Sequence, residues 1–183
     1  MLLKRAMPIA LCVLLLLITS GSALAQDDGQ GAVSGGLVTI QHDGIERTAL
    51  LTVPESYNAD EATSLVLTLH GSGGTGEQMK TALGFDALAE DTGYIVAYPD
   101  GVGQQWDYLD IPVNRVDIVD DLGYLTALID TIEAAYTIDN IYVMGWSNGA
   151  LMALRMRCAL PDRLAGVAIV GANMTFRLAE ACA

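Results

Sequence analysis

The sequence predicts one α/β domain built on a mostly parallel sheet with helices on both faces. Segments typical of strands and helices alternate along most of the chain, which is the pattern of such folds. The central strand segments are almost continuously apolar, as expected for strands buried on both faces of a parallel sheet. With 183 residues, of which 52% are hydrophobic and 17% charged, the chain can also bury a sizeable core.

The first 25 residues have the three regions of a secretory signal peptide. Lys4 and Arg5 form a basic start, and residues 6–18 are apolar apart from Pro8, too short a run to span a bilayer comfortably. Ala23-Leu24-Ala25 is a typical cleavage site. An uncleaved membrane anchor is the alternative. We expect cleavage, and hence a secreted or periplasmic protein that is not inserted stably in a membrane.

The folded domain is expected to cover residues 37–183, after a flexible Gly-, Asp- and Ser-rich leader at 26–36. The predicted strands are 37–40, 47–53, 64–69, 94–98, 141–144 and 167–170. The first two form an antiparallel hairpin, because Asp43-Gly44 is a hairpin turn signal.

Three helices are predicted between these strands. They cover residues 77–91, where Gly84 weakens the pattern, a segment capped by Asp120 or Asp121, and residues 148–160, ended by Pro161. The middle helix carries a stripe of apolar residues at spacings of three and four, which predicts one buried face. These residues are Leu122, Leu125, Ile129 and Ile132.

The motif that predicts chemistry is Gly145-Trp146-Ser147-Asn148-Gly149, a G-x-S-x-G sequence between a predicted strand and a predicted helix. In that context the serine sits on a sharp turn that lifts its hydroxyl above the sheet edge, and small flanking residues let the helix approach the strand. Ser147 is therefore the candidate nucleophile, and the Asn148 N–H is a candidate oxyanion-hole donor. The alternative is an ordinary glycine-containing turn with an idle serine. We interpret Trp146 as a packing residue rather than a substrate contact.

A second glycine-rich segment, His70-Gly71-Ser72-Gly73-Gly74, follows the predicted strand 64–69. Its backbone amides can turn toward a reacting carbonyl, and the Ser72 N–H is the candidate second oxyanion donor. A phosphate-binding loop is disfavoured because the lysine and the spacing of that motif are missing. We expect His70 to brace the loop rather than act as a general base, and His42, beside the hairpin turn, to be exposed. Loops after neighbouring parallel strands gather at one sheet edge, so Ser147 should lie near Ser72.

Charge and cysteine content limit the partners. The net charge of −13 argues against a nucleic-acid binder, which needs a basic face. Cys158 and Cys182 remain after cleavage, and in an oxidising compartment pairing is the default, although two free thiols are the alternative. No His or CxxC accompanies them, so we do not expect them to bind a metal.

The sequence resembles the secreted esterases grouped with polyhydroxybutyrate depolymerases and feruloyl or acetyl xylan esterases, in the α/β-hydrolase superfamily. The matching stretches cover most of residues 37–183 in the family's order. They are residues 69–74, 98–101, Trp106, 120–124, 142–150, Cys158, 161–162 and 165–171. The resemblance implies an α/β-hydrolase fold, a carboxylic ester substrate without a cofactor, and a bridge from Cys158 to a downstream cysteine, where Cys182 stands.

One departure from the family pattern concerns the catalytic triad. In this fold the acid and the histidine follow the serine along the chain, yet no histidine follows Ser147 here. We therefore expect the N-terminal portion of an esterase, truncated after the strand that follows the nucleophile helix and inactive alone. A degenerate non-catalytic binding protein, completion by another polypeptide, and a serine peptidase of the same fold are the alternatives. Strand 167–170 would then be an open apolar edge that lowers solubility.

Overall fold

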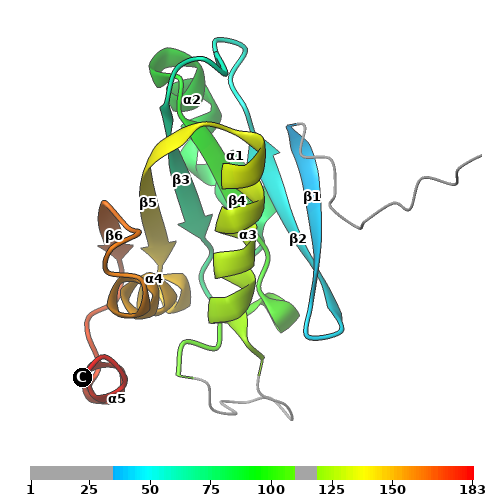
Figure 1. Ribbon diagram of the computed structural model, residues 1–183. Helices are drawn as coiled ribbons and strands as arrows, with labels where there is room; N and C mark the ends of the chain where they lie inside the picture. The colour runs from blue at the N-terminus through cyan, green and yellow to red at the C-terminus, as the bar shows by residue number, and fades with distance from the viewer. Residues whose placement is uncertain (1–34, 110–118) are drawn as a thin grey trace, which may run out of the picture.

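The computed structural model describes residues 35–109 and 119–183, which form a six-stranded sheet flanked by helices (Figure 1). The strands are β1 (Gly36–His42), β2 (Ile45–Thr52), β3 (Thr63–Leu69), β4 (Ile95–Pro99), β5 (Ile138–Trp146) and β6 (Gly166–Val170). The helices are α1 (Gly76–Leu83), α2 (Phe85–Thr92), α3 (Asp121–Ala135), α4 (Asn148–Ala159) and α5 (Phe176–Ala181), with a short 3-10 turn at Val102–Gln104. The predicted signal peptide and most of the leader lie outside the described residues.

The sheet has the predicted mixed topology. The strand order is β1-β2-β4-β3-β5-β6, and β1, β2 and β4 pair antiparallel while β4, β3, β5 and β6 pair parallel. Asp43 and Gly44 have φ angles of 50° and 75° at the hairpin tip, the left-handed pair that a two-residue turn requires. The predicted fold class is confirmed, and β1 begins at Gly36, inside the segment expected to be leader.

The two faces of the sheet bury different side chains. Leu65 and Leu67 of β3 lie in a large cluster with apolar residues of α3 and α4, whereas Val66 between them packs beside α1 and α2. This alternation follows from the period of two along a strand. In α3 the predicted stripe is buried at Leu125 and Ile129, and Asp120 is the cap, accepting from the N–H of Gly123.

The expected single helix over residues 77–91 is wrong, because the chain breaks at Gly84. This residue has φ 64°, the left-handed conformation that ends α1, and α2 begins at the next residue. Glycine adopts that conformation without steric cost, so it ends helices readily. The break lets two short helices follow the sheet surface in place of one long one (Figure 1).

The C-terminal part of the chain contains the disulfide and the outer strand of the described sheet. The predicted disulfide is confirmed: Cys158 of α4 is bonded to Cys182, just after α5, a short helix that the sequence reading missed. Strand β6 is the outer strand of the described sheet, and its Ile169 and Val170 are 40% and 41% exposed. The predicted open apolar edge is therefore present in the described part of the chain.

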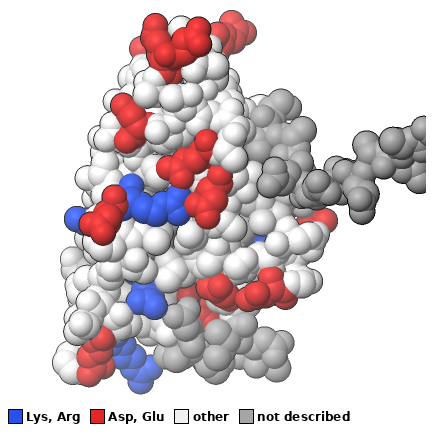
Figure 2. All heavy atoms as spheres, in the orientation of Figure 1, with Lys and Arg blue, Asp and Glu red and all other residues white. Residues whose placement is uncertain are grey.

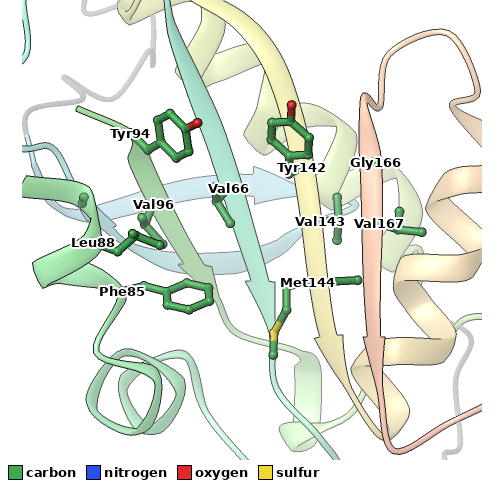
Figure 3. A pocket seen from close by; sticks show the side chains of 12 residues that line it. Val66, Phe85, Leu88, Tyr94, Val96, Tyr142, Val143, Met144, Gly166 and Val167 are labelled. Carbon is green, nitrogen blue, oxygen red and sulfur yellow. The ribbon is translucent and has the colours of Figure 1, made fainter. Parts of the chain in front are cut away.

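The surface carries an apolar hollow and a face with many acidic side chains. On the α2 side, a hollow of about 400 Å³ is lined almost entirely by apolar side chains (Figure 3), among them Val66, Phe85, Leu88, Tyr142 and Met144. Figure 2 shows acidic groups at several places on one face, with basic side chains flanked by acidic ones near its middle. Within the described ranges, no helix has the length and apolar character needed to cross a bilayer.

Candidate active site

Ser147 stands on the sharp turn between β5 and α4. Its φ and ψ angles are 51° and −114°, a conformation that non-glycine residues rarely adopt. The flanking glycines explain how the turn fits. A Cβ atom at Gly145 would overlap the backbone carbonyl of Gly149, and a Cβ atom at Gly149 would overlap the carbonyls of Leu69 and His70. Both small positions of the motif are therefore required for the helix to start this close to the strand ends.

The glycine-rich loop lies directly beside this turn. Leu69 and Gly145 are partners in the parallel pairing of β3 and β5, so the segments that follow them leave the sheet at the same edge. A Cβ atom at Gly71 would lie 3.4 Å from the Cβ of Ser147. The predicted neighbourhood of the two motifs is thus confirmed.

The loop forms a tight turn from Gly71 to Gly74. The N–H of Gly74 donates to the carbonyl of Gly71 at 3.0 Å, and Gly73 has φ 77°, as its place in this turn requires. The N–H of Gly73 donates to the carbonyl of Gln104 at 2.8 Å. Among the described residues, the N–H groups of Ser72 and Asn148 have no acceptor. The two amides predicted for the oxyanion hole therefore remain available to a ligand.

His70 uses one ring nitrogen within the loop and the other toward the segment after β4. Nδ1 lies 2.8 Å from the carbonyl oxygen of Gly71, and Nε2 lies 3.0 Å from the backbone nitrogen of Gly101. Because the carbonyl accepts and the N–H donates, this pattern fits a neutral imidazole with its proton on Nδ1. Burial lowers the pKa of His70, which favours the same neutral form. His70 braces the loop, as predicted.

Trp106 connects the loop to the helix that follows Ser147. Its backbone N–H donates to Asn148 Oδ1 at 2.7 Å, and its carbonyl accepts from Asn148 Nδ2 at 3.1 Å. Its indole N–H donates to the carbonyl of His70 at 2.9 Å, and its ring lies 4.9 Å from the imidazole between centroids. The residue is 2% exposed, so these bonds are made away from water. Trp106 therefore fixes the two candidate oxyanion amides relative to each other.

A buried ion pair stabilises the segment that contains Trp106. Arg47 Nη2 lies 2.6 Å from Asp121 Oδ1, and the other Asp121 oxygen accepts from the backbone N–H of Asp107 at 2.6 Å. The Arg47 guanidinium also lies 3.9 Å from the centre of the Tyr124 ring. Because Asp107 follows Trp106 directly, the ion pair holds the segment that joins the two halves of the site.

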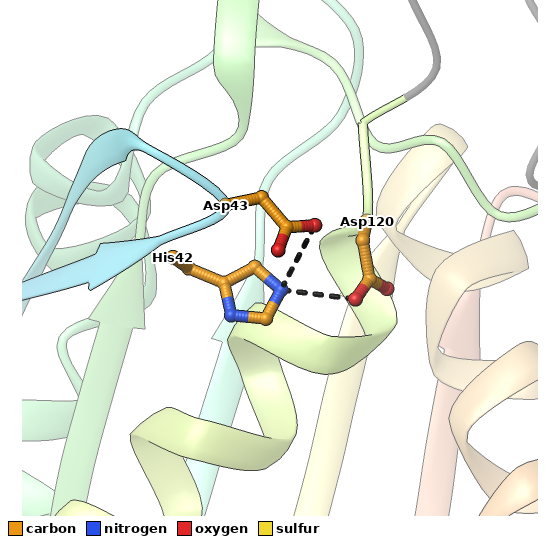
Figure 4. A group of neighbouring side chains, drawn as sticks. All are labelled: His42, Asp43 and Asp120. Carbon is orange, nitrogen blue, oxygen red and sulfur yellow. Dashed lines mark hydrogen bonds and ion pairs between the residues drawn. The ribbon is translucent and has the colours of Figure 1, made fainter.

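His42 is not the exposed turn residue that we expected. Its side chain is 20% exposed, and Nε2 lies 2.9 Å from Asp120 Oδ2 and 3.9 Å from Asp43 Oδ2 (Figure 4). The three groups are close enough to share a cation. However, Asp120 caps α3, and the positive end of a helix dipole disfavours a cation there. We interpret the cluster as a hydrogen-bonded contact that holds the hairpin against α3.

The interpretation of Trp146 as a packing residue is also wrong. The residue is 52% exposed and its side chain lies against Gly71, so the indole forms part of the surface beside the nucleophile. It lines a hollow of about 280 Å³ together with the glycine-rich loop and α1. The sequence gives no signal for this, because the tryptophan of a G-x-S-x-G motif can point into the sheet or out of it.

The two histidines of the sequence, His42 and His70, are both engaged elsewhere. Strand β1, which carries His42, is four strand spacings, or about 19 Å, from β5. The His42 Nε2 and both ring nitrogens of His70 therefore have other hydrogen-bond partners. The other residues missed by sequence reasoning, Arg47 and the Asn148 side chain, are long-range partners that no local pattern reveals.

Several proteins named as esterases are similar to this chain in sequence. No protein-family profile matches the chain. The chain is 36% identical to "Putative esterase NocK" of Nocardia uniformis subsp. tsuyamanensis over 123 residues, 66% of this chain and 36% of that protein. It is 25% identical to "Probable feruloyl esterase C" of Aspergillus terreus over 173 residues, 88% of this chain and 60% of that protein. A third relative, "Poly(3-hydroxybutyrate) depolymerase" of Ralstonia pickettii, is 29% identical over 134 residues, 63% of this chain and 26% of that protein.

Solved structures match the fold. An acetyl xylan esterase from Aspergillus awamori superposes with a TM-score of 0.59 at 22% identity, over 75% of this chain and 53% of that chain. A thermostable esterase superposes with a TM-score of 0.61 at 23% identity, over 72% and 39%. The chain spans between about a quarter and three fifths of the curated relatives' length. The chain is therefore similar in sequence to proteins named as esterases, feruloyl esterases, acetylxylan esterases and a polyhydroxybutyrate depolymerase, and it has the α/β-hydrolase fold.

Proposed function

We propose that this protein is a secreted serine ester hydrolase that acts on polyester or plant-polymer esters, with Ser147 as the nucleophile. The observation that carries the proposal is the strained Ser147 turn, with the glycine-rich loop packed against it and two backbone amides available there. The names of the relatives favour an ester over a peptide substrate, since the turn itself serves both chemistries.

The proposed reaction proceeds in two steps. Ser147 Oγ attacks the ester carbonyl carbon while its proton passes to a base, and the carbonyl oxygen becomes an oxyanion that accepts from the N–H groups of Ser72 and Asn148. Collapse of this intermediate breaks the bond to the alcohol oxygen, which takes the proton, and leaves an acyl-serine. Water then attacks the acyl carbon, giving the carboxylic acid and restoring Ser147.

We further propose that the base is a histidine outside these 183 residues, oriented by an acid that is also outside them. Support comes from the engagement of His42 and His70 in other contacts and from the greater length of the relatives. Without a base, Ser147 keeps a high pKa and reacts slowly. We therefore expect residues 26–183 alone to be nearly inactive, and the product of the complete reading frame to be active.

Hydrolysis of 4-nitrophenyl acetate tests the proposal. The complete product should lose about 10³-fold or more in kcat/KM when Ser147 is changed to Ala, because the nucleophile is removed. Ser64→Ala is the matched control. Ser64 lies near the start of strand β3, at the end away from the glycine-rich loop, so its loss should leave kcat/KM within about twofold. Equal activity of the wild type and Ser147→Ala would contradict the proposal. Robust Ser147-dependent turnover by residues 26–183 alone would refute the external base.

A further inference from the structure

The segment that follows β4 contacts the glycine-rich loop near both of its ends. At the first end, the backbone N–H of Gly101 donates to His70 Nε2 at 3.0 Å. Beyond the other end, where α1 begins, the backbone N–H of Gly76 donates to Asp100 Oδ1 at 2.7 Å. Ser72 lies between these two contacts along the chain. Two adjacent residues, Asp100 and Gly101, therefore fix both ends of the stretch that carries the Ser72 N–H.

We propose that Asp100 is a positioning residue for ester hydrolysis, whose carboxylate determines the direction of the Ser72 N–H by fixing the α1 end of the loop. The inference rests on the proposed function, because the direction of this N–H matters only if a carbonyl oxygen is bound there. It adds a residue that acts on the reaction through the loop and not by contact with the substrate.

The start of α1 explains why an acceptor is needed at this point. The first N–H groups of a helix have no partner within the helix, and a negative charge is favoured beside them. The Thr75 side chain accepts from the N–H of Gln78, and the Asp100 carboxylate accepts from that of Gly76. A Cβ atom at Gly76 would lie 2.2 Å from the carbonyl oxygen of Tyr98, so α1 starts directly against the end of β4. The carboxylate thus fixes the helix start where its backbone approaches the sheet most closely.

The Asp100 side chain is itself held in place. Its Oδ2 accepts from Thr48 Oγ1 at 3.2 Å, and its backbone N–H donates to the Thr48 carbonyl at 2.9 Å. Its carbonyl accepts from Arg47 Nη2 at 3.2 Å. Thr48 and Arg47 both belong to β2. Asp100 therefore connects a strand of the sheet to the start of α1 and is positioned before any substrate binds.

The middle of the loop lies on the same segment. The N–H of Gly73 donates to the carbonyl of Gln104, and Gly73 directly follows Ser72. Loss of the Asp100 carboxylate would remove the acceptor of the Gly76 N–H and let the α1 end of the loop shift. A shift of about 1 Å in a catalytic group can slow a reaction about 10²-fold. We therefore expect the rate to depend on Asp100, although the residue lies outside the loop.

Hydrolysis of 4-nitrophenyl acetate by the complete product tests the inference. Asp100→Ala should lower kcat about 10–100-fold and leave KM within about threefold. The reason is that the oxyanion forms in both steps of the reaction but not in the bound ester. Asp100→Asn keeps an oxygen that can accept from the Gly76 N–H, so its kcat should stay within about threefold of the wild type.

Asp86→Ala is the matched control. The Asp86 carboxylate of α2 accepts from Thr52 Oγ1 at 2.7 Å and from the Tyr98 hydroxyl at 2.8 Å. These partners belong to β2 and β4 and lie outside the glycine-rich loop. Asp86→Ala therefore removes a comparable set of hydrogen bonds, and its kcat should stay within about twofold of the wild type.

Inhibition by trifluoroacetone separates positioning from a merely structural role. Ser147 Oγ adds to the carbonyl carbon of this ketone while its proton passes to the base, and the carbonyl oxygen becomes an oxyanion that needs the same N–H groups. In Asp100→Ala the Ki should rise by about the factor by which kcat/KM falls, and in Asp86→Ala it should not change. If Asp100→Ala does not fold, Thr48→Val removes one hydrogen bond from the carboxylate and should lower kcat about threefold.

Three results would overturn the inference. The first is unchanged kcat in Asp100→Ala or, where that variant does not fold, in Thr48→Val. The second is an equal loss of kcat in Asp86→Ala or in Asp100→Asn, because neither change removes the acceptor of the Gly76 N–H. The third is a rise in KM without a loss of kcat, which would assign Asp100 to ester binding. The proposed function fails separately, if Ser147→Ala leaves ester hydrolysis intact, so the two failures can be told apart.

Discussion

The two sides of the Ser147 turn are held in different ways. On the side of the glycine-rich loop, the side chains of His70, Trp106 and Asn148 form a buried hydrogen-bonded connection. On the side of β6, Ser147 is joined through its own N–H, which donates to the carbonyl of Val170 at 2.8 Å. Val170 is exposed, and its strand has a neighbour on one side only within the described residues. The comparison teaches that the candidate oxyanion side is connected by side chains of distant segments, whereas the β6 side is joined to Ser147 by a backbone hydrogen bond.

The largest difference between the two sides should appear when an arginine is removed from each. Arg47→Ala deprives the fully buried Asp121 of its cation, which should lower the free energy of unfolding by about 3–5 kcal/mol. Arg163→Ala removes a solvent-exposed ion pair with Asp130 and Glu133 near β6, and should cost less than about 1 kcal/mol. Urea denaturation of both variants measures this. Similar losses of unfolding free energy in the two variants would show that the buried Arg47–Asp121 pair contributes no more to stability than the exposed pairs of Arg163.

A smaller contrast is expected between two glycines. Gly149→Ala forces a methyl group onto the carbonyls of Leu69 and His70, and should cost about 3 kcal/mol by overpacking. In Gly166→Ala the new methyl group meets only the Tyr142 ring, at 3.4 Å, and should be neutral or slightly stabilising, since alanine suits a strand better than glycine. Thermal unfolding of the two variants distinguishes them. A tolerated Gly149→Ala would mean that α4 can move away from the strand ends.

The smallest expected effect concerns pH. Because burial lowers the pKa of His70 in the folded protein, the unfolded chain binds a proton more readily. The stabilisation from neutral His70 is therefore complete above about pH 6.5 and is lost as pH falls below 6.5 toward the lowered value. Unfolding free energies at pH 7.5 and 5.5 should differ more in the wild type than in His70→Gln. An equal pH dependence in both proteins would show that His70 is not held neutral.

Much of the fold and of the candidate site could be predicted from the sequence where a pattern of a few neighbouring residues determines the structure. The strand–helix alternation, the hairpin at Asp43-Gly44 and the Ser147 turn all follow from patterns within a few residues. The errors have physical causes of two kinds. Gly84 weakens the helical pattern, but the apolar periodicity does not show that this residue adopts the left-handed conformation that ends α1. The orientation of Trp146 and the His42–Asp120 pair depend on residues far away in the chain, which periodicity does not encode.

The central claim is that the loop of Ser72 and the turn of Ser147 act on one carbonyl. Ser72 is the second residue of the Gly71–Gly74 turn, a position that proline accepts, so Ser72→Pro removes the N–H with little change of backbone. The most direct test is kcat/KM for 4-nitrophenyl acetate in the complete product carrying Ser72→Pro or Ser72→Ala. We predict a loss of about 10²–10³-fold for Ser72→Pro, and a value within about threefold of the wild type for Ser72→Ala, which keeps the amide. Full activity of Ser72→Pro, or an equal loss in both variants, would contradict the claim.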